Sequence, residues 1–164
     1  MTEARLFRRA MACFATGIAI VTSKWEQQLC GMTVNSLTSV SLKPPLLLVC
    51  LAYNSRTRNA IIRSGHFAVN ILSSRQAYLS ERFSRPGEDH FRDIRVRPGE
   101  HDLPLIPGCL AYLICRVQSR YGEGDHDIIV ASVQQTEVQP GSPLLFFRSQ
   151  YHALADNAAD FWYW

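Results

Sequence analysis

The hydrophobic pattern at the start of the chain is helical. Apolar residues recur at positions i, i+1, i+4, i+5 and i+8, and most charged residues fall on the opposite side. The apolar positions are Leu6, Phe7, Ala10, Met11 and Phe14. The pattern predicts an amphipathic helix that docks on a core and ends at Thr16-Gly17.

The rest of the chain is dominated by short runs typical of β-strands, which are β-branched or apolar and bounded by polar, Gly or Pro residues. The predicted strands are Ile18–Ser23, Leu29–Asn35, Leu46–Ala52, Phe67–Leu72, Leu110–Tyr121, Asp127–Val138 and Leu144–Phe147. The first two are separated by a short polar stretch and form a predicted hairpin. Gly122 to His126 joins the two longest runs as a loop.

Two short helices interrupt these strands. Asn54-Ser55 is a capping sequence before the helix Arg56–Ser64, which Gly65 ends, and Ser73-Ser74 begins a helix that continues to Phe83. The Pro-, Gly- and charge-rich stretch Arg85–Pro107 reads as irregular structure. We expect the segment Arg75–Arg97, which holds several arginines interleaved with acidic residues, to be solvated and mobile.

Six or seven strands, a few short helices and no βαβ alternation predict a mainly β protein built as an antiparallel barrel. No internal repeat or linker divides the sequence, so residues 1–164 are expected to form a single domain.

Composition narrows the class of protein. Hydrophobic residues make up 47% and charged residues 19% of the 164 positions, as in an ordinary globular protein. The longest apolar run, Leu46–Tyr53, is too short to cross a membrane as a helix, and the net charge of +3 is too small and scattered to indicate nucleic-acid binding. Five cysteines without a C-x-x-C pair indicate reduced thiols in a cytoplasmic protein. An alternative treats the arginines before Ala10–Val21 as the start of a secretory signal.

Several common functional motifs are missing from the sequence. Gly122-x-Gly124 lacks the third glycine of a dinucleotide-binding fingerprint and leads into a strand, and no phosphate-binding loop or nucleophile elbow occurs. Histidine and cysteine spacing matches no zinc site. Asp125-His126-Asp127 alternates along a strand, so its side chains point to opposite faces, and we expect no metal site.

The most unusual stretch follows Gly31, where six hydroxyl or amide side chains occur within nine residues ahead of Pro44-Pro45. One interpretation is a β-arch whose hydroxyls satisfy its own turns. The other is a polar ligand-binding segment, with Gly31 allowing a second group to approach the backbone.

Ordered motifs along most of the chain resemble the short-chain flavin reductase family. They are Arg5-Leu6-Phe7-Arg8, Phe14-Ala15-Thr16-Gly17, Gly31-Met32-Thr33-Val34-Asn35-Ser36, Ser39-Val40-Ser41-Leu42-Lys43-Pro44-Pro45, Phe67-Ala68-Val69-Asn70-Ile71-Leu72-Ser73, Gly124-Asp125-His126, Pro143-Leu144-Leu145-Phe146-Phe147 and Tyr151-His152. Within the family, the sequence is most similar to the reductase components of phenol hydroxylase and 4-hydroxyphenylacetate hydroxylase.

This resemblance implies an FMN-binding split β-barrel, antiparallel and Greek-key-like, usually a homodimer. It implies an enzyme that reduces FMN or FAD with NADH or NADPH and supplies reduced flavin to a flavin-dependent monooxygenase. The flavin ring is expected along Thr33, Val34, Asn35 and Ser36, and the phosphate near Ser55, Arg56 and Thr57. Cys50, Leu51 and Ala52 are expected to line the path between ring and phosphate, with Phe83 near the adenylate end of FAD.

The resemblance implies that His126 contacts the hydride donor, NADH or NADPH, and orients its nicotinamide. Without the resemblance, a histidine at this position is interpreted as a solvated turn residue. Two departures stand out: Val34 occupies a position that is alanine in many relatives, and Phe161-Trp162-Tyr163-Trp164 is unusually aromatic. The last segment is expected to form a hydrophobic clasp or, alternatively, a lid over the flavin. Two other functions remain open: a split-barrel flavoprotein that reduces a metal or corrin, and a flavin-binding protein without turnover.

Overall fold

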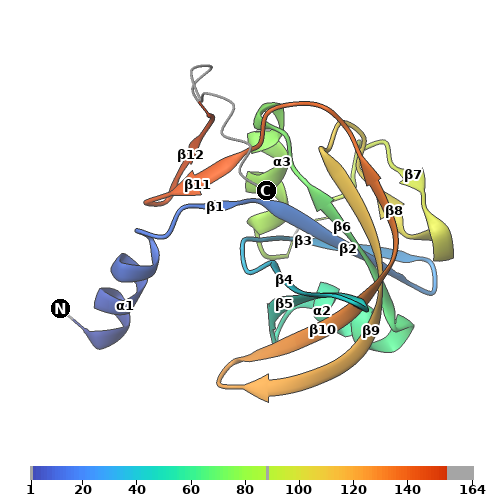
Figure 1. Ribbon diagram of the computed structural model, residues 1–164, viewed down its shortest axis with the longest axis horizontal. Coiled ribbons are helices and arrows are strands. Elements are labelled where there is room, and N and C mark those ends of the chain that lie inside the picture. The colour runs from blue at the N-terminus through green and yellow to red at the C-terminus, as the bar shows by residue number, and fades with distance from the viewer. Residues whose placement is uncertain (1, 88, 155–164) are drawn as a thin grey trace.

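In the computed structural model, which describes residues 2–87 and 89–154, one antiparallel sheet curls into a barrel (Figure 1). Its strands follow the spatial order β3-β2-β6-β9-β10-β5-β4. In chain order they are β2 (Ala19–Trp25), β3 (Gln28–Val34), β4 (Thr38–Leu42), β5 (Pro45–Ala52), β6 (His66–Ile71), β9 (Ala111–Glu123) and β10 (His126–Val138). The predicted mainly β, antiparallel fold class is confirmed.

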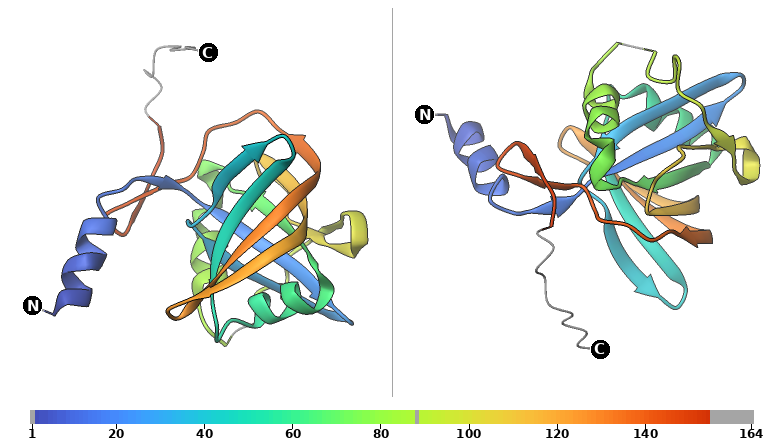
Figure 2. Two further views of the ribbon diagram at one scale, coloured as in Figure 1. Left: turned by 60° about the horizontal axis from the view of Figure 1, so that its bottom comes forward. Right: turned by 90° about the horizontal axis from the view of Figure 1, so that it is seen from above.

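The edges of this sheet, β3 and β4, follow one another in the chain and are joined by residues 35–37. The right-hand view of Figure 2 shows the β2–β3 hairpin and the β4–β5 pair pointing in different directions. The barrel is therefore open between β3 and β4. The stretch that the sequence singled out as polar crosses this opening.

Two hydrophobic clusters lie on the two sides of the sheet. One fills the barrel and includes Val21, Val49, Ile61 and Phe67, while the other includes Ile20 and lies outside the barrel. Because β2 and β6 are buried on both faces, every second residue enters a different cluster. This explains the continuous apolar runs Ile18–Val21 and Phe67–Val69.

Helices close the barrel at one end and cover its side. The helix α2 (Arg56–Ser64) buries Ile61 in the barrel cluster, and α3 (Ala77–Ser84) buries Leu79 and Phe83 in the outer cluster. The predicted local signals are present: Ser55 is the N-cap of α2, Gly65 ends it with φ +73°, and Ser73 forms a capping box with Gln76 of the 3-10 helix η1 (Ser74–Gln76).

The first helix differs from its prediction. None of the residues of α1 (Glu3–Met11) is buried, and the helix stands away from the barrel (Figures 1 and 2). Leu6, Phe7, Met11 and Phe14 are all exposed. The helix is amphipathic as predicted, but it does not dock on the core of its own barrel.

Beside α1 lies a small sheet of order β1-β11-β12, made of β1 (Thr16–Gly17), β11 (Leu145–Phe147) and β12 (Gln150–His152). A two-stranded sheet, β7 (Arg97–Pro98) with β8 (Pro104–Leu105), encloses the 3-10 helix η2 (Glu100–Asp102).

The segment Arg75–Arg97 was expected to be solvated, and the structure contradicts this. Leu79 and Phe83 are almost fully buried, and Phe91 packs against the same outer cluster. Leu103, Leu105 and Ile106, which follow this segment, are also almost fully buried. Asn70 of β6 also accepts a hydrogen bond from the Ile106 amide at 2.9 Å. The many charged residues of the segment suggested a solvated chain, although its apolar residues pack in the core.

Candidate functional site

The opening of the barrel brings the first predicted flavin-binding segment against β5. The Ser36 hydroxyl donates to the Cys50 carbonyl and accepts from the Cys50 amide, each at 3.1 Å. A single serine side chain thus replaces a missing strand neighbour. The end of the segment 33–36 and the segment 50–52, separate in the sequence, are thus in contact.

Within that segment the four side chains have different surroundings. The Thr33 hydroxyl donates to the Ser80 carbonyl of α3 at 2.7 Å, and Val34 is buried in the barrel cluster. Asn35 is exposed. Since Thr33 and Ser36 already have protein partners, the Asn35 amide and the local backbone are the groups best placed to meet a polar ring edge.

Strand pairing places His126 on the same surface. β5 and β10 are antiparallel, with Ala52 opposite His126, Leu51 opposite Asp127 and Cys50 opposite Ile128. Opposed residues share a face of the sheet, so Cys50 and Ala52 lie on the His126 side. Leu51 is fully buried inside the barrel, which leaves only its backbone for a ligand.

The start of α2 adjoins this surface. Ser55 Oγ accepts a hydrogen bond from the Arg58 amide at 3.2 Å and donates to the Met32 sulfur on β3 at 3.1 Å. Thr57 is buried in the first turn of the helix, whereas Arg56 is exposed. Helix N-termini favour anions because first-turn N–H groups point outward and the dipole is positive there.

The charge of Arg56 acts on the Cys30 thiol of β3. Burial raises the pKa of the Cys30 thiol, and the Arg56 guanidinium partly offsets that rise. The helix dipole and this guanidinium both make the start of α2 electropositive, which suits a phosphate.

His126 is the first residue of β10 and not part of a longer loop. Only Gly124 and Asp125 separate it from β9, and Gly124 has φ +59°, as a type II′ hairpin turn requires at its first central position. His126 Nδ1 donates to the Asp125 carboxylate at 2.6 Å. This hydrogen bond and the His126 charge lower the pKa of Asp125 and leave Nε2 for another partner.

Phe83 is not brought to this surface. Its ring is 1% exposed, packs edge-on against Phe91 and lies where a Cβ on Gly31 would be 2.7 Å from Phe83 Cε1. The group that approaches the Gly31 backbone is therefore the protein's own Phe83. Gly31 and Thr33 face α3, while Met32 between them faces Ser55, so Phe83 lies behind β3 as seen from the start of α2.

Sequence reasoning missed an ion pair directly beneath the site. Arg58 of α2 and Asp127 of β10 pair at 2.5 Å, with the Asp127 side chain only 3% exposed. The available signal was alternation: a residue next to an outward-facing His126 on a strand must face inward. Its partner on α2 was not readable from spacing.

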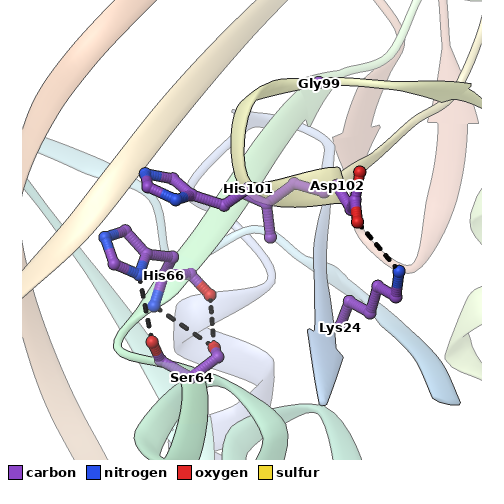
Figure 3. Close-up of a pocket in the computed structure, with 7 residues that line it drawn as sticks. Lys24, Ser64, His66, Gly99, His101 and Asp102 are labelled. Carbon is purple, nitrogen blue, oxygen red and sulfur yellow. Dashed lines mark hydrogen bonds and ion pairs between the residues drawn. The ribbon is translucent and has the colours of Figure 1, made fainter. Parts of the chain in front are cut away.

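A hollow of about 500 Å³ lies at the other end of α2 (Figure 3). Its lining includes stacked His66 and His101 rings, 4.0 Å apart between centroids, and the Lys24–Asp102 ion pair at 3.2 Å. Ser64, the last residue of α2, also lines it. The helix C-terminus presents carbonyls, so this hollow is electrostatically the wrong end for a phosphate.

In the part of the chain that the structure describes, no three or more His, Cys, Asp or Glu side chains are grouped closely enough to hold a metal ion. No helix in residues 2–87 and 89–154 has both the length and the apolar character needed to cross a membrane.

Residues 11–155 match the family model described as "Flavin reductase like domain". The FMN reductase (NADH) SmoA of Agrobacterium fabrum is 41% identical over 144 residues, 88% of this chain and 82% of that protein. The Mycobacterium tuberculosis reductase subunit HsaB of a flavin-dependent monooxygenase is 38% identical over 152 residues, covering 91% and 81%.

Solved structures agree with these relatives. Nitrilotriacetate monooxygenase component B from Mycobacterium thermoresistibile superposes with a TM-score of 0.94 at 34% identity, covering 99% of this chain and 92% of that one. The Streptomyces globisporus NADH:FAD oxidoreductase SgcE6, in complex with NAD and FAD fragments, has a TM-score of 0.90 at 32% identity, covering 95% of each chain.

Proposed function

The chain belongs to the flavin reductase-like family, and from that membership we propose an NAD(P)H-dependent flavin reductase that supplies reduced FMN or FAD to a partner flavin-dependent monooxygenase. The names of two relatives specify NADH, which supports NADH as the donor.

One observation supports the proposal: three segments that are separate in the sequence, and His126, are linked by neighbouring contacts. Ser36 bonds to Cys50, Ala52 pairs with His126, and Ser55 contacts Met32 next to Thr33. A long flat ligand with a polar ring at one end and a phosphate at the other matches this layout. The exposed Asn35 amide would face the ring edge, and Arg56 with the first turn of α2 would hold the phosphate.

When bound, a flavin supplies the ring that accepts a hydride. The residues of this chain position and shield the reactants. Cys50 and Ala52 offer a half-buried, weakly polar surface beside His126, which limits water near the ring. His126 Nε2 would bind the nicotinamide amide, while Asp125 fixes Nδ1. This contact would hold the nicotinamide in a fixed position relative to the flavin ring.

We also propose a homodimer with a cytoplasmic location. The exposed apolar side chains of α1 have a second copy of this chain as their partner, and so do Val40 and Leu42 of β4, the latter 85% exposed. Leu144 is buried in its own core, so β11 would contribute to the interface from Leu145 onward. The five cysteines are all free, which supports a reducing compartment.

The deciding experiment is NADH oxidation by the purified protein with and without added FMN or FAD. A flavin reductase oxidises NADH in proportion to added flavin. A protein that reduces a metal or corrin instead needs that acceptor for turnover, and a flavin-binding protein without activity gives no oxidation in either case. Turnover that requires a metal or corrin acceptor, or none at all, rejects the proposal.

His126 is tested within the same assay. The His126→Ala variant should bind FMN with unchanged affinity and be reduced normally by dithionite, yet lose about a hundredfold in its rate of reduction by NADH, because about 1 Å of misplacement costs that much. His101→Ala in the remote hollow is the matched control and should behave as the parent. A parental rate in His126→Ala would return His126 to the role of a turn residue.

A further inference from the structure

We propose that Asp127 is a positioning residue, which through Arg58 holds the His126 turn in a fixed relation to the first turn of α2. This inference rests on the proposed function, since it assigns the donor side to His126 and the phosphate side to α2. It adds that the two sides are joined by a buried ion pair.

The pair is close and well shielded from solvent. Asp127 Oδ2 accepts from Arg58 Nε at 2.6 Å, and Arg58 Nη2 lies 2.5 Å from the same oxygen. The two side chains are 3% and 18% exposed for Asp127 and Arg58. Arg120 of β9 approaches the other carboxylate oxygen at 3.8 Å. One carboxylate therefore pairs with guanidinium groups from two separate elements.

Backbone geometry transmits this contact to His126. Along β10 the side chains alternate, so Asp127 points into the barrel end and His126 points to the candidate surface. Adjacent residues of a paired strand cannot shift independently. A fixed Asp127 carboxylate consequently limits how far the His126 ring can move.

A second contact connects the same two segments. The Tyr53 amide, just before α2, donates to the Asp125 carbonyl at 3.1 Å. The Arg58 guanidinium lies over the Tyr53 ring, 5.3 Å from its centroid, and the Tyr53 hydroxyl occupies the space a Cβ on Gly122 would need, at 2.6 Å. The turn and the helix start are thus held by one backbone bond and one ion pair.

If the ion pair is lost, we expect the turn at residues 124–126 to move more than the start of α2. Thr57, Ala60 and Ile61 anchor α2 in the barrel core, whereas Asp125 at the hairpin tip is 95% exposed. Loss of the Asp127 charge should release the turn and leave the helix start in place. Flavin affinity should then survive while donor positioning fails.

The test compares Asp127→Asn with Glu137→Gln, which removes a carboxylate from an exposed ion pair on the same strand, far from His126. We expect Asp127→Asn to lower the rate of flavin reduction by NADH at least tenfold and to raise KM for NADH, with FMN affinity and dithionite reduction within about twofold of the parent. Glu137→Gln should match the parent in all four.

Arg58→Lys and Arg58→Met keep the inference falsifiable if Asp127→Asn does not fold. Lysine can still pair with Asp127 through one nitrogen, so Arg58→Lys should retain several times more NADH activity than Arg58→Met. Equal activity in the two variants, or a folded Asp127→Asn with parental NADH kinetics, overturns the inference.

A measurement independent of activity separates this inference from the proposed function. Amide hydrogen exchange at residues 124–127 should be at least tenfold faster in Asp127→Asn than in Glu137→Gln, even if the parent protein oxidises no NADH. Unchanged exchange at the turn overturns the positioning role. An NADH-inactive parent with faster exchange in Asp127→Asn would reject only the proposed function.

Discussion

Gly31 is the residue at which the ring of Phe83 reaches the backbone of β3. A Cβ there would lie 2.7 Å from Phe83 Cε1 and 3.2 Å from the Phe91 ring, and Phe83 is fully enclosed in the outer cluster. The glycine thus serves the packing of α3 on β3 and needs no ligand to explain it.

We therefore predict that Gly31→Ala destabilises the protein by about 1–3 kcal/mol, the usual effect of overpacking a core. Urea unfolding measures this. Gly17→Ala, where a Cβ has no atom within 4 Å, is the control and should change stability by less than about 0.5 kcal/mol. Adding Phe83→Leu should recover part of the loss, and no recovery would mean that another contact excludes a side chain at Gly31.

Buried thiols make stability depend on alkaline pH. Burial raises the pKa of Cys109 and of Cys115 to about 12. Between the ordinary thiol range and about pH 12, the unfolded chain loses protons that the folded chain keeps. The contribution of the two protonated thiols to the free energy of unfolding is complete below the ordinary thiol pKa and is lost as pH rises toward about 12.

The free energy of unfolding should accordingly fall above about pH 9, with each buried thiol contributing up to about 1.4 kcal/mol per pH unit. Urea unfolding at pH 8, 9 and 10 under reducing conditions gives the slope. Cys115→Ala should reduce that slope, and Cys13→Ala, an exposed thiol, should leave it unchanged. Equal slopes in both variants would contradict the assignment.

At the scale of elements, α2 has two ends with opposite character. Its first turn is capped by Ser55 and lies beside the candidate surface, while its last residue, Ser64, lines the hollow of Figure 3. The helix dipole makes only the first end suitable for a phosphate. Because of this polarity, one substitution at Ser55 can preserve helix capping and still weaken phosphate binding.

Ser55→Asp should keep the helix cap, because aspartate caps as well as serine and suits the positive end of the dipole. The protein should unfold at a urea concentration equal to or above that of the parent. A carboxylate at that place repels a phosphate, so FMN should bind at least tenfold more weakly, while riboflavin, which lacks the phosphate, keeps its affinity.

Two variants at the same end of α2 serve as controls for that substitution. Arg56→Ala should weaken FMN binding without disturbing the cap, and Ser55→Ala should lower stability by about 1 kcal/mol. If Ser55→Asp binds FMN as tightly as the parent does, the phosphate does not lie at the start of α2.

For the whole molecule, the unusual feature is the placement of α1 outside the barrel. A strongly amphipathic helix with no buried residue, together with the exposed β4 edge, leaves apolar surface that the single chain does not cover. The homodimer proposed above would bury that surface.

Leu6→Ser combined with Phe7→Ser should dissociate the dimer. Each buried Leu or Phe contributes about 1.5–3 kcal/mol and occurs twice in a dimer, so the dissociation constant should rise at least about a thousandfold. Arg5→Ser with Arg8→Ser, on the same helix, should leave the dimer intact. Sedimentation velocity across micromolar concentrations measures both, and a monomeric parent contradicts the proposal.

Local signals determined most of the elements. Ser55 and Gly65 marked both ends of α2, Ser73 marked the start of the next helical segment, and β-branched runs marked β2 and β6, because caps and alternation act within a few residues. The strand β4 was missed, since its Ser- and Thr-rich sequence is equally typical of a loop and only pairing with β5 makes it a strand.

The sequence by itself also identified, through motifs, the segments that form the candidate site. Tertiary structure alone decided which side chains meet: strand register set Ala52 opposite His126, the opening of the barrel brought Ser36 to Cys50, and the placement of α2 gave Asp127 its partner Arg58. It also moved Phe83 into the core and left α1 uncovered. Motifs and periodicity describe neighbours along the chain, whereas register and helix docking are set by how the whole sheet buries its apolar surface.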